Sequence, residues 1–228
     1  MKKPLVVGYK GEIGRFILSG LLRTLPNAVD IFCVDKNDTE ENVVQRIMDC
    51  DTIFLCVPMA DTVKWLKRHW DLCKGKLIVE QTSLKGWIEG CPGQNYLSMH
   101  ILFRPSETPN KEDRRVVIIE QPKKDLEYYA MFDVIEKITE STIELCKSIE
   151  IHDKCMAMNQ ALVHRVIVKL GQEIRMTPYR TFISQKVIDL ADRIERGGDL
   201  VLEIQKNPRM IPFLNGFKNN LTINPLFM

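Results

Sequence analysis

The sequence lacks the features that mark several large classes of protein. No apolar run approaches the roughly 20 residues of a membrane-spanning helix, and the chain begins with a strand-like segment rather than the apolar core of a signal peptide. The net charge of +2 is too small to indicate nucleic acid or an anionic membrane as a partner. Internal repeats and low-complexity segments are also missing. With 45% hydrophobic and 27% charged residues, the composition is typical of a soluble globular protein.

The seven cysteines include no C-x-x-C pair, and several lie inside apolar, strand-like runs, where cysteine behaves as a small hydrophobic residue. An odd number of scattered cysteines favours reduced thiols over disulfides, so we expect a cytoplasmic protein. Metal binding by His152, Asp153 and His164 is an alternative that lacks the spacing of a metal motif, and we expect no metal.

The most informative segment is a glycine turn between the apolar run at residues 4–7 and a helical pattern from Arg15 to Leu25. Its glycines are spaced GxxGxxG. In a strand–turn–helix unit the first glycine makes a tight turn, the second lets backbone N–H groups approach a pyrophosphate, and the third lets helix and strand pack closely. An ordinary glycine turn is the alternative interpretation. The predicted cofactor-binding residues of this turn are Gly8, Tyr9, Lys10, Gly11, Glu12, Ile13 and Gly14.

A second strand, predicted over residues 28–34, ends in Asp35. A carboxylate at this place in a dinucleotide-binding unit accepts a hydrogen bond from the ribose 2′-OH. It also repels a 2′-phosphate, so NAD is favoured over NADP, although Lys36 offsets part of the repulsion.

Strand-like and helix-like segments alternate over residues 1–149, whereas residues after 150 show only helical periodicity. Further strands are predicted at 51–57, 76–80, 96–101, 115–119 and 142–146, and helices at 39–49, 60–70, 125–138, 152–175, 178–196 and up to about 206, before an irregular tail. We therefore predict an α/β protein. A Rossmann-type, doubly wound, mostly parallel sheet occupies residues 1–149, and a small all-α domain for substrate binding and dimerisation occupies residues 150–228.

Polar side chains follow the predicted strands at the edge where a doubly wound sheet binds its ligands. Val57 and Pro58 end the third strand beside the expected cofactor. Ser83 and Lys85 place a hydroxyl and an amine after the fourth strand, and His100 lies near the end of the fifth. Each is interpretable alone as a structural or loop residue, but their common location indicates a site.

The long helix predicted after residue 150 carries Asp153, Ala157, Gln160 and His164 at spacings of four, three and four, which place them on one face. A solvated or capping face is the alternative. Arg180 is predicted to start the next helix and to return towards that face, and its guanidinium suits bidentate binding of a carboxylate.

Together these segments resemble the prephenate/arogenate dehydrogenase family of tyrosine biosynthesis over residues 4 to about 206. The matching elements are the glycine turn, Val57-Pro58, Ser83-x-Lys85, the His100 segment, Tyr179-Arg180 and the helix His152-Asp153-x-x-Met156-Ala157-x-x-Gln160-Ala161-Leu162-x-His164. The resemblance implies NAD-dependent oxidative decarboxylation of prephenate to 4-hydroxyphenylpyruvate.

The resemblance also implies residue roles. His100 would be the catalytic histidine that takes up the proton of the substrate's ring hydroxyl, and Ser83 would orient that histidine beside the nicotinamide. The implied substrate-binding residues are His164, Arg180, Gln160 and Asp153, with the aspartate orienting the arginine.

The chain departs from the family where His100-Ile101-Leu102-Phe103-Arg104-Pro105 replaces the usual His-Pro-Met-Phe-Gly-Pro, and its helical domain is short. Arogenate and 4-amino-4-deoxyprephenate are alternative substrates. A catalytically weakened dinucleotide-binding interaction protein is an alternative of another class. The family pairs its helical domains across a two-fold axis, and the many apolar residues of 152–206 predict a homodimer.

Overall fold

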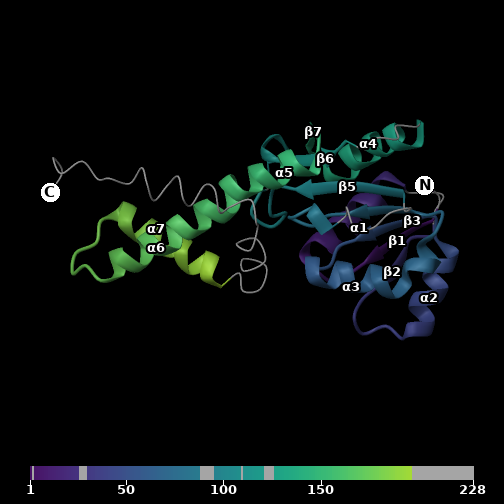
Figure 1. Cartoon of the computed structure of the whole chain (residues 1–228), viewed down its shortest axis with the longest axis horizontal. Helices are drawn as coiled ribbons and strands as arrows, with labels where there is room; N and C mark the ends of the chain where they lie inside the picture. The colour runs from purple at the N-terminus through teal and green to yellow at the C-terminus, as the bar shows by residue number, and fades with distance from the viewer. Residues whose placement is uncertain (2, 26–29, 88–94, 109, 121–125, 197–228) are drawn as a thin grey trace. The chain divides into compact units, whose positions relative to one another are not determined.

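The structure is a computed structural model, and Figure 1 shows its helices and strands. The described residues are 1, 3–25, 30–87, 95–108, 110–120 and 126–196. The chain divides into two compact units, Met1–Ile149 and Glu150–Met228. The first residues of the predicted second strand, the helix predicted to end near 206 and the tail lie outside the described residues.

The first unit is built on one seven-stranded sheet with the strand order β2-β1-β3-β4-β5-β6-β7. Its strands are β1 (Pro4–Val7), β2 (Phe32–Val34), β3 (Thr52–Leu55), β4 (Leu77–Glu80), β5 (Asn95–Ile101), β6 (Arg115–Ile119) and β7 (Thr142–Cys146). Strands β1 to β5 run parallel, β6 is antiparallel to β5, and β7 is parallel to β6. The chain moves outward in opposite directions from β1, so the switch point of the sheet lies between β1 and β3. The predicted Rossmann-type sheet is confirmed.

Helices cover both faces of this sheet. The first unit contains α1 (Glu12–Thr24), α2 (Glu40–Asp49), α3 (Met59–His69), α4 (Leu126–Thr139) and the 3-10 helices η1 (Trp70–Cys73) and η3 (Lys111–Asp113). Val6 packs in the cluster with residues of α1 and α4, whereas its neighbours Leu5 and Val7 pack with residues of α2, α3 and η1. Successive residues of a strand point to opposite faces, and both faces are covered, which explains the continuous apolar runs of the central strands.

Helix α2 begins where the sequence predicts it. The Thr39 hydroxyl oxygen accepts a hydrogen bond from the backbone N–H of Asn42 at 3.3 Å, which satisfies one of the exposed donors at the start of the helix.

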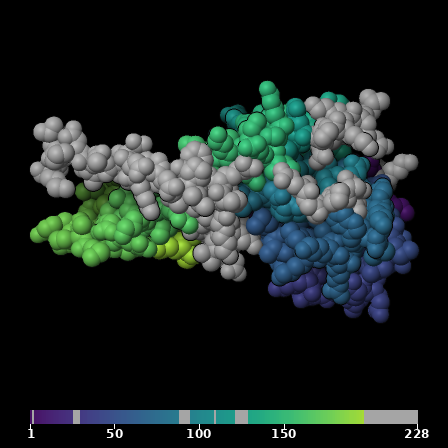
Figure 2. Space-filling model, in the orientation of Figure 1, coloured from purple at the N-terminus to yellow at the C-terminus, as the bar shows by residue number. Residues whose placement is uncertain are grey.

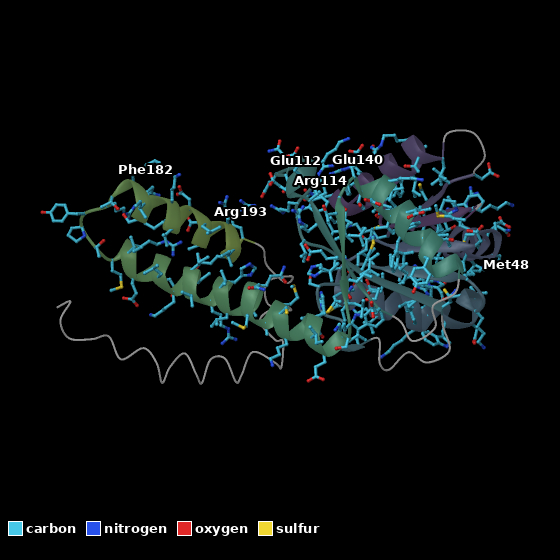
Figure 3. The ribbon with its side chains drawn as sticks, turned by 90° about the horizontal axis from the view of Figure 1, so that it is seen from above. Met48, Glu112, Arg114, Glu140, Phe182 and Arg193 are labelled. Atoms are coloured by element: carbon cyan, nitrogen blue, oxygen red, sulfur yellow. The ribbon has the colours of Figure 1, made fainter. Side chains whose placement is uncertain are left out.

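Glu140 lies in the turn between α4 and β7. Its φ angle is 49°, a left-handed conformation that is uncommon for a residue with a side chain. Its carboxylate lies 2.7 Å from Lys111, 3.4 Å from Arg23 of α1 and 3.6 Å from Arg114. Figure 3 labels Glu140 and Arg114. The hydrogen bond from Lys111 is the main cause that lowers the pKa of Glu140, and the neighbouring positive charges add to it. One carboxylate therefore links three separate segments of the first unit.

The described part of the second unit is helical, and its chain begins within α5. Its elements are α5 (Ile149–Met156), the π-helical segment η4 (Ala157–Leu162), α6 (Val163–Arg175) and α7 (Phe182–Glu195). Helices α6 and α7 lie side by side (Figure 1). A Cβ atom added to Gly171 would lie 2.5 Å from the Cβ of Ala191, so this glycine permits the close approach of the two helices. Arg175 joins their surfaces through Asp192 and Glu195.

Two predicted helices have different limits in the structure. The helix predicted over 152–175 begins at Ile149 and contains the π-helical segment. The helix predicted from Pro178 begins only at Phe182. The reason is a capping box, in which Thr181 accepts from the N–H of Ser184 at 3.1 Å and donates its own N–H to the Ser184 hydroxyl at 2.7 Å.

Among the described residues, no helix combines the length and apolar character needed to span a membrane. The same part of the chain contains no cluster of three or more His, Cys, Asp or Glu side chains suited to a metal ion.

Candidate functional site

The glycine turn connects β1 to α1 at the switch point of the sheet. Gly8 adopts φ of 80° and donates its N–H to the carbonyl of Val34 at 2.8 Å, which ties the turn to the end of β2. A Cβ atom at Gly8 would lie 2.6 Å from Cγ1 of Val57. The position therefore requires glycine both for its conformation and for its closeness to the end of β3.

The other two glycines have distinct structural roles. Gly11 is the N-cap of α1 and, having no side chain, forms no capping bond to the first-turn N–H groups of the helix. A Cβ atom at Gly11 would lie 3.3 Å from the Gly8 oxygen and 3.9 Å from the Cys56 oxygen. At Gly14 it would lie only 2.1 Å from the Gly8 oxygen, because helix and turn are packed directly together.

Asp35 follows β2 and faces the same turn. Its carboxylate accepts the backbone N–H of Lys10 at 3.2 Å and that of Lys36 at 2.9 Å. The Asp35 N–H is in turn bound by the Asp38 carboxylate at 2.7 Å. These bonds fix the carboxylate beside the glycine turn and leave lone pairs for further donors.

A cavity of about 650 Å³ opens at this edge of the sheet. Its lining includes the predicted cofactor-binding residues Gly8, Lys10, Gly11, Asp35, Val57 and Pro58. The other predicted cofactor-binding residues, Tyr9, Glu12, Ile13, Gly14 and Ser83, are not part of that lining.

Sequence reasoning missed the far wall of the cavity, which comes from α2, from α3 and from Asp38 before α2. Its residues are Asp38, Glu40, Val43, Asp61, Lys64, Trp65, Arg68 and His69. His69 is buried, with one ring nitrogen 2.9 Å from the Trp65 carbonyl and the other 3.1 Å from the Glu40 carboxylate. The spacing of Asp61, Trp65 and Arg68 on one face of α3 is a signal that could have identified this wall.

Ser83 and His100 lie after or near the ends of adjacent parallel strands. In the β4–β5 pairing Glu80 is opposite Ser98, so the loop with Ser83 leaves the sheet beside the segment that carries His100. His100 is 4% exposed, and Ser83 is half-buried. Lys85, predicted to present an amine at the rim, is instead fully buried and bound to Glu80.

The second unit contains two polar groups that lack a partner among the described residues. Oε1 of Gln160 and Nδ1 of His164 are both buried without a hydrogen bond. Burial also lowers the pKa of His164, which favours the neutral imidazole. Gln160 lies in the π-helical segment, a distortion that occurs frequently at functional sites. A buried polar atom without a hydrogen bond is uncommon in folded proteins, so these two atoms are candidates for binding a polar ligand.

Asp153 and Arg180 lie at opposite ends of the same unit. Asp153 is buried in α5 and bound to Nδ1 of His152 at 2.9 Å. Arg180 is exposed in the connection between α6 and α7. The run from His164 to the end of α6 alone covers about 16 Å at the rise of an α-helix. The structure therefore does not bring the Arg180 of a chain to its own Asp153 or His164.

Comparison with solved structures finds proteins of the same fold along nearly the whole chain. Prephenate dehydrogenase from Aquifex aeolicus, solved with hydroxyphenyl propionate and NAD+, matches with a TM-score of 0.71 and 20% identity, over 97% of this chain and 88% of that one. A putative prephenate dehydrogenase from Corynebacterium glutamicum gives 0.73 and 14%, over 96% and 79%. Synechocystis arogenate dehydrogenase gives 0.70 and 17%, over 96% and 89%. No protein-family model matches the sequence, and no curated protein matches it significantly. The chain thus has the fold of these dehydrogenases.

Proposed function

We propose that this chain is a NAD-dependent dehydrogenase that oxidatively decarboxylates prephenate or a close relative. The observation that carries the proposal is the cavity at the switch point of the sheet, where the glycine turn and the Asp35 carboxylate meet. Ligands of doubly wound sheets bind at this place. The structural likeness to dehydrogenases of prephenate and arogenate supports the choice of reaction.

The cavity residues fit a dinucleotide. Gly11 has no side chain to cover the first-turn N–H groups of α1, which suits a pyrophosphate, and Asp35 suits the adenosine ribose. Two cations of the far wall are paired, since Lys64 lies 3.7 Å from Asp61 and Arg68 lies 2.9 Å from Glu40. Charges already neutralised by carboxylates offer little attraction to a 2′-phosphate, which favours NAD over NADP.

His100 and Ser83 carry the proposed chemistry. The nicotinamide, when bound, accepts the hydride that leaves the ring carbon bearing the hydroxyl. His100 takes the proton of that hydroxyl and returns it to the ring oxygen after CO2 has left. Ser83 orients the imidazole. Prephenate and NAD+ thereby give 4-hydroxyphenylpyruvate, CO2 and NADH, and the protein contributes chiefly alignment because aromatisation supplies the driving force.

The substrate is held by groups of the second unit. Gln160 and His164 offer the unsatisfied polar atoms described above. Arg180 binds a carboxylate of the substrate through its planar guanidinium. Because Arg180 lies beyond the far end of α6 from His164, we place it in the site of a second copy, where the Asp153 of that copy orients it.

A homodimer provides that second copy. The α6–α7 pair, drawn in green to yellow in Figure 2, carries large exposed apolar side chains. They include Val163, Val166, Leu170, Phe182, Ile183 and Leu190. Large apolar side chains exposed on one helix pair are a feature of subunit interfaces, and a symmetric dimer covers the same surface on both copies.

A mixing experiment tests the shared site. His100→Asn and Arg180→Ala homodimers should each be inactive, and exchange of their subunits should restore about a quarter of the wild-type activity, because hybrid dimers keep one complete site. If mixing restores nothing although hybrids form, Arg180 acts within its own subunit.

The function itself is tested by following reduced nicotinamide after adding NAD with prephenate, arogenate or 4-amino-4-deoxyprephenate. The preferred substrate should give the highest kcat/KM. NAD binding without turnover of any of the three would favour the alternative of a dinucleotide-binding interaction protein.

A further inference from the structure

The strongest feature that the proposed mechanism does not use is a buried ion pair at the carboxyl ends of β4 and β5. Lys85 and Glu80 are both fully buried, and Nζ of Lys85 donates to Oε1 of Glu80 at 2.6 Å. The same ammonium donates to the carbonyl of Met99 at 2.6 Å. Lys85 therefore joins the loop after β4 to the backbone of β5.

Glu80 gathers the remaining polar groups around it. Its Oε1 also accepts the hydroxyl of Ser98, and its Oε2 accepts the backbone N–H of Thr82 at 2.9 Å and the hydroxyl of Thr82 at 2.6 Å. The indole N–H of Trp87 donates to the same Thr82 hydroxyl at 2.9 Å. Each carboxylate oxygen has at least two donors, so the buried charge is well satisfied.

A buried ion pair of this kind is poor evidence of a contribution to stability, because well-packed apolar residues often do as well. The ion pair matters instead because it fixes the positions of the groups that it connects. Charge-assisted hydrogen bonds are short and directional, and they restrict the groups that they connect to one arrangement. The groups connected here flank the two proposed catalytic side chains. Thr82 and Lys85 lie on either side of Ser83, and Met99 directly precedes His100.

We propose that Lys85 is a positioning residue that, through Glu80 and the Met99 carbonyl, fixes the Ser83 loop against the strand that carries His100. The inference rests on the proposed function for its catalytic consequence, but its structural part stands on the contacts alone. A displacement of about 1 Å at a reacting group can lower a rate by about 100-fold, so the connection matters for turnover.

The test uses the full chain with the double variant Glu80→Gln/Lys85→Met. It removes both charges together, keeps side chains of similar size, and retains an acceptor for Thr82, so no unpaired charge is left buried. It removes the bond to the Met99 carbonyl. The matched control is Lys76→Met, because Nζ of Lys76 also binds backbone carbonyls, those of Cys50 at 2.7 Å and Met48 at 3.3 Å, away from the β4–β5 edge.

We expect kcat of the double variant to fall by about 10- to 100-fold, while the Kd for NAD stays within about twofold of wild type. Neither Glu80 nor Lys85 lines the cavity. Lys76→Met should leave both constants unchanged. An unchanged kcat in the double variant overturns the inference. A parallel loss of kcat and NAD affinity, with a lower melting temperature, overturns it in favour of a purely structural pair.

A second readout separates this inference from the proposed function. The chain has four histidines, so the ring signals of His100 can be assigned in NMR spectra with His100→Asn. Inactivity of the wild type on all three substrates refutes the proposed function alone. The positioning claim then depends on the His100 ring signals, which should shift in the double variant and not in Lys76→Met. If the double variant does not fold, Glu80→Asp undergoes the same measurements, since its side chain is shorter by one methylene group and moves the carboxylate away from Lys85 and Ser98.

Discussion

The substitution Gly11→Ala separates cofactor binding from stability better than any other change in the glycine turn. Gly11 has φ of −69° and ψ of 165°, an extended conformation that alanine adopts without strain. The new methyl group meets protein atoms only at 3.3 and 3.9 Å, so the apo fold has to yield by a few tenths of an ångström. We expect the free energy of unfolding to change by no more than about 1 kcal/mol.

The effect on NAD is expected to be much larger. The methyl group occupies the space in which a pyrophosphate would approach the first-turn N–H groups of α1. If two charge-assisted hydrogen bonds of about 1.5 kcal/mol each are lost, the affinity falls by about 100-fold.

Two other glycines of α1 give matched controls, because a Cβ atom would lie 2.1 Å from a backbone oxygen at each of them. At Gly14 the atom is the oxygen of Gly8, and at Gly20 it is the oxygen of Ile138 on α4. Relief of either contact requires a backbone shift of about 1 Å or more. The better helix propensity of alanine, about 1 kcal/mol, does not offset overpacking of about 1–3 kcal/mol or more.

Urea unfolding and isothermal titration with NAD provide the measurements. Gly20→Ala should lose stability and, where it is folded, keep most of its NAD affinity. Gly14→Ala should lose both, and Gly11→Ala should lose only affinity. Wild-type NAD affinity in Gly11→Ala would refute the assignment of the turn as the phosphate site.

Three further predictions concern the first unit and the thiols. Asp35→Ala should reduce the preference for NAD over NADP, measured by titration of both cofactors, and equal affinities in the wild type would contradict the role of Asp35. Because the pKa of Glu140 is lowered by Lys111 and its other cationic neighbours, its contribution to stability is present above the ordinary pKa of 4.5 and lost as pH falls through the folded value. Glu140→Gln should therefore flatten the decline in the free energy of unfolding below pH 4.5, and an unchanged slope would assign that decline to other carboxyls. Cys155 is exposed, whereas burial raises the pKa of Cys56 to about 12, so a thiol reagent at neutral pH should modify Cys155 much faster, as peptide mapping can show.

The first unit could be predicted from the sequence because its central strands are apolar on both faces and its elements alternate between strand-like and helix-like patterns. Strand β6 (Arg115–Ile119) and strand β7 (Thr142–Cys146) have the predicted limits. The N-cap Thr39 also follows from local chemistry, since a hydroxyl before two acidic residues marks a helix start. Such signals depend on neighbours in the chain and need no knowledge of tertiary contacts.

The remaining features depend on contacts between distant residues. The burial of Lys85 follows from the β4–β5 register, which sets Ser98 opposite Glu80, and no local pattern indicates which way a lysine points. Trp65 and Arg68 of α3 line the cavity together with Asp35 after β2, and only the folded sheet brings these segments together. The π-helical segment around Gln160 could not be predicted either, because the spacing of apolar residues does not distinguish a π-helix from an α-helix.

Arg104 illustrates how a residue that looks disruptive in the sequence is accommodated in the fold. It follows His100 at a position where the dehydrogenase family that the sequence resembles usually has glycine, and a cation near a substrate would alter its binding. In the structure its guanidinium lies 2.9 Å from Glu107 and 3.7 Å from Glu12, the first residue of α1. Ser106 donates its N–H to the same Glu12 carboxylate at 3.1 Å and adds a hydroxyl bond, which is the main cause that lowers the pKa of Glu12. The charge of Arg104 is thus balanced by carboxylates, and the segment after His100 is tied to the glycine turn. The substitution therefore adds a connection between the two parts of the proposed site rather than an unpaired cation within it.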